Sequence, residues 1–197
     1  MFNILLDALP EDYEGYPINT AFQTGILISM CLSDEELSEH ERILTALTLL
    51  YGDNIPPMET ALAGLKWFMS ETNHDNYEGV KSDNIIIMDY DVDQYRIYAA
   101  FRNQYHIDLN TADMHWFEFN GLLDNIRECS LTDVMQLRQT KIPSHFSAKE
   151  RRELEAKQKI FRLGKKNVDE EYSESEKQRI NNFLQYANIK NQSHAAP

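Results

Sequence analysis

Between Ile85 and Arg138 the sequence carries apolar and aromatic residues at the three- and four-residue spacing that buries one face of a helix. The spacing predicts a first helix at residues 91–105, a second at 110–126 and a third at 130–138. Helices joined by such short connections must pack as near neighbours, and the aromatic side chains fill the space between them. This stretch therefore predicts the core of a helical domain, and nothing in it is a catalytic motif.

Cap residues and further periodic segments extend the helical pattern along the chain. Asn110 or Thr111 can cap the second helix of the central stretch, and Ser130 with Asp133 has the pattern of a capping box for the third. The same serine-to-acid pattern recurs at Ser33–Glu36, Ser38–Glu41 and Ser147–Glu150. Apolar spacing predicts further helices at about 20–32, 38–52, 57–72, 147–163 and 174–189.

The few glycines and prolines support the same fold class. Seven glycines and six prolines argue against a loop-rich all-β protein. Residues 2–9 are predicted to form a strand or a helical turn, and residues 13–17 to be extended because proline disfavours helix at the residue before it. We predict an all-α fold, with a compact multi-helix domain and a C-terminal helical extension.

Charge is unevenly distributed along the chain. Lys and Arg number 19 against 32 Asp and Glu, a formal net charge of -13. Acidic residues outnumber basic ones threefold in residues 1–148, whereas residues 149–197 carry a small basic excess. With the break at Pro143–Ser144, this predicts an acidic all-helical core domain at 1–143 and a charged helical C-terminal extension at 144–197. The net charge disfavours binding to nucleic acid or to an anionic membrane.

The sequence also predicts the compartment. The longest apolar run, Gly25–Leu32, is too short to cross a bilayer. The first basic residue is Arg42, so the beginning of the chain lacks the positive charge of a secretion signal. Cys31 and Cys129 lie far apart and are predicted to be reduced, buried thiols. These features predict a protein that stays in a cytoplasm.

Three groups of residues resemble binding motifs but lack essential members. The alternating acids of residues 89–93 begin like a calcium loop, yet Gln94 replaces the required glycine and Ala100 the twelfth ligand. Residues 79–82 end like a phosphate-binding loop but lack its first glycine and the glycine just before the lysine. Metal-ligand types also occur at His106, Asp108, Asp113 and His115, where the spacing matches no zinc pattern. We predict hydrogen-bonded structural histidines, no metal or cofactor, and no enzyme activity.

An ordered set of residues is similar to a family of phage proteins. In the central stretch the set comprises Ile97, Tyr98, Ala99, Ala100, Phe101, Tyr105, Ile107, Asp108, Leu109, His115, Trp116, Phe119, Leu122, Leu123 and Arg138. Elsewhere it comprises residues 16–20, 51–52, 55–57 and 149–152. The set spans Met1 to Gly164 and resembles the tail-assembly chaperones of siphophages that infect Gram-positive bacteria.

This resemblance implies a protein that binds and solubilises the tape-measure protein, the long, largely helical chain that sets tail length. It implies action in the host cytoplasm during tail morphogenesis, without ATP or catalysis. Tail-tube subunits and a frameshifted longer form of the chain are further implied partners, and self-association is left open. Two alternatives remain: a virion structural or adaptor subunit of the tail, and a small enzyme that uses residues 106–115.

A chaperone of this kind must cover an apolar helix that would otherwise aggregate. Grooves lined by aromatic and methionine side chains can do so. The candidate partner-binding residues, those expected to have spare apolar faces, are Trp67, Phe68, Trp116, Ile180, Phe183, Leu184 and Ala187. The competing interpretation, in which both tryptophans belong to the core, stays open.

Overall fold

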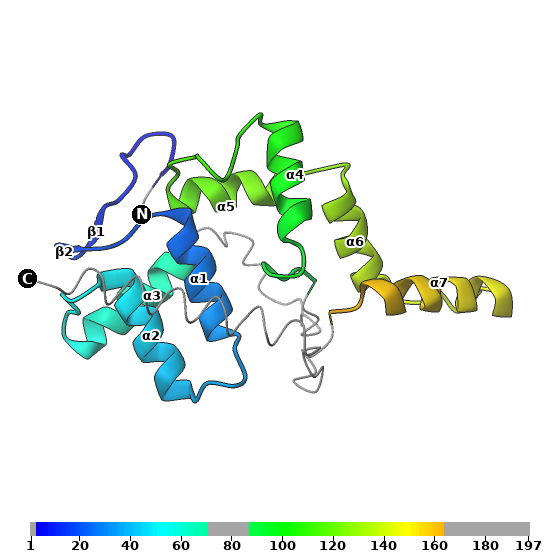
Figure 1. Ribbon diagram of the computed structural model, residues 1–197, viewed down its shortest axis with the longest axis horizontal. Helices are drawn as coiled ribbons and strands as arrows, with labels where there is room; N and C mark the ends of the chain where they lie inside the picture. The colour runs from blue at the N-terminus through cyan, green and yellow to red at the C-terminus, as the bar shows by residue number, and fades with distance from the viewer. Residues whose placement is uncertain (1–2, 71–86, 164–197) are drawn as a thin grey trace, which may run out of the picture. The chain divides into compact units, whose positions relative to one another are not determined.

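The computed structural model describes residues 3–70 and 87–163, which contain seven helices and one pair of short strands (Figure 1). The fold class is all-α, as predicted. The predicted helix at 174–189 and the loop at 79–82 lie outside the described residues. In chain order the elements are β1 Asp12–Tyr13, β2 Tyr16–Pro17, α1 Phe22–Leu32, α2 Glu39–Tyr51, α3 Met58–Ser70, α4 Gln94–Gln104, α5 Trp116–Asp124, α6 Ser130–Gln139 and α7 Ala148–Phe161.

The first three helices lie largely where the apolar spacing predicts, and α2 also has its predicted caps. At the start of α2 the capping box is formed: Ser38 N donates to Glu41 Oε2 at 2.9 Å, and Glu41 N donates to Ser38 Oγ at 3.3 Å. The helix ends at Gly52, whose φ of 62° suits a residue without a Cβ. The box predicted at Ser33–Glu36 is wrong, because the Ser33 hydroxyl instead donates to Ser29 O within the last turn of α1.

The segment before α1 is a tight hairpin. Asp12 pairs with Pro17 and Tyr13 with Tyr16. The two residues between the strands, Glu14 and Gly15, both have positive φ, as the type I′ turn of a two-residue hairpin requires. The extended conformation predicted for residues 13–17 is therefore confirmed at Tyr13, Tyr16 and Pro17, and it is wrong at the two turn residues.

In the central stretch the predicted start of the second helix and the predicted cap of the third are wrong, whereas the third helix begins at Ser130 as predicted. Helix α5 begins at Trp116, because the backbone before it is paired with the chain that enters α1: Phe22 N donates to Met114 O and Trp116 N to Thr20 O. Helix α6 is capped by Cys129, whose N donates to the Thr132 hydroxyl at 3.0 Å, rather than by a Ser130–Asp133 box. In both cases periodicity does not reveal the hydrogen-bond partner, which is a backbone oxygen at the start of α5 and the Thr132 hydroxyl at the start of α6.

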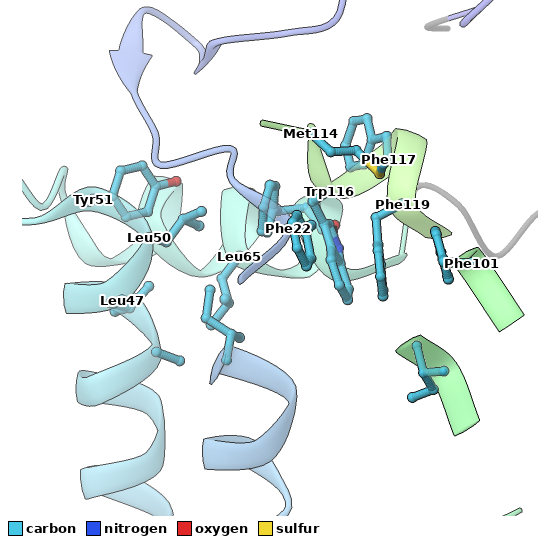
Figure 2. Close-up of a cluster of buried hydrophobic side chains, with 14 of the residues drawn as sticks. Phe22, Leu47, Leu50, Tyr51, Leu65, Phe101, Met114, Trp116, Phe117 and Phe119 are labelled. Carbon is cyan, nitrogen blue, oxygen red and sulfur yellow. Dashed lines mark hydrogen bonds between the residues drawn. The ribbon is translucent and has the colours of Figure 1, made fainter. Parts of the chain in front are cut away.

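The core is organised around aromatic side chains of α5. Phe119 is fully buried, and its ring lies 4.9 Å from that of Phe22 on α1 and 5.0 Å from that of Phe101 on α4. The Trp116 ring lies 5.8 Å from that of Phe119 (Figure 2). It also lies 6.2 Å from the ring of Phe68 of α3. Through these contacts α5 joins helices α1, α3 and α4.

The compact unit to which these helices belong comprises Met1–Leu163. Helix α7 lies within it and contacts α6. The division predicted between residues 143 and 144 stays a prediction, because most of the proposed extension lies outside the described residues.

Close packing at Gly25 of α1 gives a first test. A Cβ at this position would overlap the Trp116 indole, whereas a Cβ at Gly121 on the exposed side of α5 would meet nothing within 4 Å. We expect Gly25→Ala to lower the free energy of unfolding by about 1–3 kcal/mol through overpacking. Gly121→Ala should leave it unchanged or raise it by up to about 1 kcal/mol, since alanine favours helix. Urea denaturation of both variants checks this, and an unaffected Gly25→Ala protein would contradict the packing.

Candidate partner-binding surface

The structure places two of the seven candidate partner-binding residues, Phe68 and Trp116, in the core and a third, Trp67, packed against it. Phe68 is fully buried and Trp116 is 3% exposed, with Trp116 Nε1 donating to Phe68 O at 3.1 Å. The half-buried Trp67 ring lies between those of Tyr13 and Phe117, at 5.2 and 5.3 Å. In the folded domain Phe68 and Trp116 thus present almost no surface to a partner, and the core interpretation of Trp116 is confirmed. Ile180, Phe183, Leu184 and Ala187 lie outside the described residues.

Other apolar side chains are exposed in pairs on the outer faces of helices. On α1, Leu27 and Met30 are 50% and 39% exposed. On α3, Met58 and Leu62 are 53% and 40% exposed. A spacing of three or four residues puts both members of a pair on the same side of their helix. Each pair combines a leucine with a methionine, whose flexible side chain adapts to varied apolar partners.

The most exposed consecutive apolar residues form a short turn near the start of the chain. Ile4, Leu5 and Leu6, which we call the N-terminal apolar turn, are 51%, 87% and 82% exposed. Asn3 N donates to Asp7 Oδ2 at 2.8 Å, and Leu5 N donates to Asn3 Oδ1 at 2.9 Å. The turn is therefore closed by its own hydrogen bonds and holds three apolar side chains in water.

The sequence predicts either a strand or a helical turn here, and it holds a signal that favours the turn. Asn3 and Asp7 flank the apolar triplet, and such side chains form local hydrogen bonds with the backbone that compete with strand and helix. Of the two conformations predicted for residues 2–9, the helical turn is closer to the structure, since Asp7 N donates to Asn3 O across four residues. Its exposure could not be read from the sequence.

A buried ion pair holds α4, α6 and α7 together. Asp93 and Arg138 have side chains that are 0% and 4% exposed, and they are joined by two hydrogen bonds of 2.6 and 3.1 Å. Arg138 also donates from Nε to Phe161 O of α7 and from a terminal nitrogen to Ile87 O. Asp93 accepts a further bond from Arg96, whose guanidinium lies over the Phe161 ring. The pair therefore fixes the end of α7 against α4 and α6.

Burial of Asp93 raises the pKa of its carboxyl, but the hydrogen bonds from Arg138 and Asp89 N, with the charges of Arg138 and Arg96, bring that pKa below its ordinary value. Because the folded pKa is depressed, the pair stabilises the fold above the unfolded pKa of 3.8. This contribution is lost as the pH falls through the folded pKa.

Removal of Arg138 should strongly destabilise the domain. We expect Arg138→Met to lower the free energy of unfolding by about 3–5 kcal/mol, because the buried Asp93 carboxylate loses its counter-charge. The control is Arg102→Met, which breaks an ion pair with Asp108 whose arginine is 53% exposed and should cost less than about 1 kcal/mol. Urea denaturation at neutral pH measures both. Equal effects would show that the buried pair has no special role.

His115 joins the start of α5 to the N-terminal segment. Its Nδ1 accepts from Phe117 N at 3.0 Å, and its Nε2 lies 3.0 Å from Pro10 O. A single neutral tautomer, protonated at Nε2, satisfies both contacts. Burial lowers the pKa of the imidazole, against opposing effects of the Pro10 carbonyl and of Glu118 and Glu11. The prediction of a hydrogen-bonded structural histidine is confirmed for His115.

Protonation of His115 should destabilise the fold. Its folded pKa lies below the ordinary 6.5, so the unfolded chain takes up the proton first and stability falls as the pH drops below about 6.5. His115→Asn keeps an oxygen that can accept from Phe117 N but does not titrate. As the pH falls from 7.5 to 5.5, we expect the free energy of unfolding to decrease more in the natural protein than in this variant. Urea denaturation measures this free energy for both proteins. A pH-independent difference would contradict the assigned tautomer.

The described parts of the chain show neither a metal cluster nor a membrane span. Within residues 3–70 and 87–163, no group of three or more His, Cys, Asp and Glu side chains could hold a metal ion. No helix in these ranges is both long and apolar enough to cross a membrane. Cys31 and Cys129 are unpaired and are half-buried rather than buried.

Comparison with known proteins gives one match. A family model described as "Bacteriophage Gp15 protein" matches residues 4–163. No curated protein and no solved structure matches the chain. The matched residues include the N-terminal apolar turn, the aromatic core, the Asp93–Arg138 pair and α7.

Proposed function

The chain belongs to the bacteriophage Gp15 protein family, and from this premise we propose that it is a tail-assembly chaperone. In this proposal it binds and solubilises the tape-measure protein in the host cytoplasm, with no ATP, cofactor or catalytic step. The single observation that carries the proposal is the N-terminal apolar turn, three apolar side chains held in water on an acidic helical domain. The exposed pairs on α1 and α3 are further surfaces of the same kind.

The exposure of Leu5 and Leu6 suits transient shielding of an apolar client. Full burial of a leucine side chain contributes about 1.5–3 kcal/mol, so two leucines favour binding without making it irreversible. A chaperone that tail-tube subunits later replace needs such a contact, whereas an obligate interface would be larger and more apolar. The net charge of -13 would keep the complex in solution.

Co-expression with the long tail gene next to its own gene tests the proposal. We expect the natural protein to keep that gene product in the soluble fraction and to co-purify with it. Leu5→Ser with Leu6→Ser should reduce both effects by about tenfold or more, because two apolar contacts are lost. The variant should keep the natural stability, since both side chains are exposed in the folded protein.

The matched control removes two exposed apolar side chains from another element. Val92 and Tyr95, 54% and 81% exposed near the start of α4, are changed to serine. An equal loss in both variants would show that the N-terminal apolar turn has no particular role. An insoluble tail product that does not co-purify with the natural protein would overturn the chaperone proposal. Recovery of the chain from purified virions would instead favour a structural or adaptor subunit.

A further inference from the structure

Helix α7 is attached to the domain by one side only. Leu154, Gln158 and Phe161 lie on this side and are half-buried. Gln158 Nε2 donates to the backbone oxygens of Leu137 and Thr140 at 3.0 and 2.6 Å, which ties the helix to the end of α6. Figure 1 shows the rest of α7 extending away from α1–α5. No residue of α7 is buried, so its opposite side faces solvent.

The solvent side of α7 is a basic face with an apolar end. Lys149, Arg152 and Lys159 are exposed and recur at intervals of three and seven residues, which keeps them on one side of the helix. At 1.5 Å per residue they form a row about 15 Å long. Next to Lys159, Ile160 is 74% exposed. The pair between Lys149 and Glu153, at 3.9 Å, is too exposed to neutralise this face.

The complementary surface is found on the same chain. The connection between α1 and α2 and the first turn of α2, here called the acidic segment, carry Asp34, Glu35, Glu36, Glu39 and Glu41 within eight residues. Asp34, Glu36 and Glu39 are exposed. Since α7 contacts α6 and the acidic segment joins α1 to α2, the two surfaces belong to different parts of the domain.

We propose that the basic face of α7 binds the acidic segment of a second copy of this chain. The contact joins two different surfaces, so each copy keeps one unused surface of each kind and can add a further copy. The result is a head-to-tail assembly in which α7 is the connecting arm.

Charge favours a second copy over nucleic acid as the occupant. A nucleic-acid phosphate backbone would meet a chain whose net charge is -13 and whose acidic residues exceed basic ones throughout residues 1–148. A second copy instead offers a local cluster of negative charge at the acidic segment, where Asp34, Glu36 and Glu39 are exposed. This inference does not depend on the proposed client, because it concerns the purified chain alone.

Sedimentation velocity of the full chain tests the contact. At about 0.1 M salt the Debye length of about 10 Å screens the net repulsion between copies but not close ion pairs, whereas at about 1 M it falls to about 3 Å. We expect species well above the 23.0 kDa of one chain at the lower salt, and dissociation at the higher salt. The double variant Arg152→Glu with Lys159→Glu should sediment as single chains at both salt concentrations.

Two further variants distinguish the effect of where the charges lie from the effect of the total net charge on assembly. Lys66→Glu with Arg127→Glu changes the net charge equally through exposed cations on other parts of the domain, and should assemble like the natural protein. Glu36→Lys with Glu39→Lys should fail to assemble alone. Mixed with the α7 variant, it should restore assembly, because each chain then meets an opposite charge. Single chains of the natural protein at 0.1 M salt, equal loss in the control, or no assembly in the mixture would each overturn the proposal, as would α7-dependent binding of DNA.

Discussion

The packing of α4, α6 and α7 against one another depends on the Asp93–Arg138 ion pair. Removing two charges from water is costly, and the pair is tolerated because nearly every donor and acceptor around it is used. A fully bonded carboxylate and guanidinium have one arrangement that satisfies both, so they specify geometry more than they add stability. That geometry sets how α7 leaves the domain, since the Phe161 carbonyl is one of the acceptors of Arg138.

The aromatic side chains play a different part from the one that their abundance first indicates. The packing of α5 against its neighbours buries the rings of Phe119, Trp116 and Phe101, so little of their surface is accessible to a partner. Apolar surface is instead left on shorter side chains at the N-terminal apolar turn and on α1 and α3. In the proposed function this separation is useful, because the side chains that hold the domain together are not those proposed to contact an apolar client.

The sequence predicts the elements better than their junctions. Apolar spacing and cap patterns such as Ser38–Glu41 place the helices, because both are local properties of the chain. The start of α5 and the cap of α6 could not be placed, since they depend on Thr20 meeting Trp116 and on the Thr132 hydroxyl reaching back to Cys129. The exposure of the candidate partner-binding residues could not be predicted. Spacing places Trp116 and Phe68 on apolar helix faces, but the packing of the helices decides whether such a face is buried or exposed. The ion pair of Asp93 with Arg138 joins residues 45 apart, so only the folded chain brings them together.

The two proposed contacts rest on different forces, and this difference matters for how an assembly could be taken apart. A client held by exposed leucines is bound mainly through the hydrophobic effect, which salt does not weaken. Copies held together through α7 and the acidic segment are bound through charge, which salt does weaken. Neither contact needs the other, so the loss of one neighbour would not release the client. A growing tail tube could then remove copies singly from one end of a head-to-tail array, since only the end copy has a single neighbour to lose.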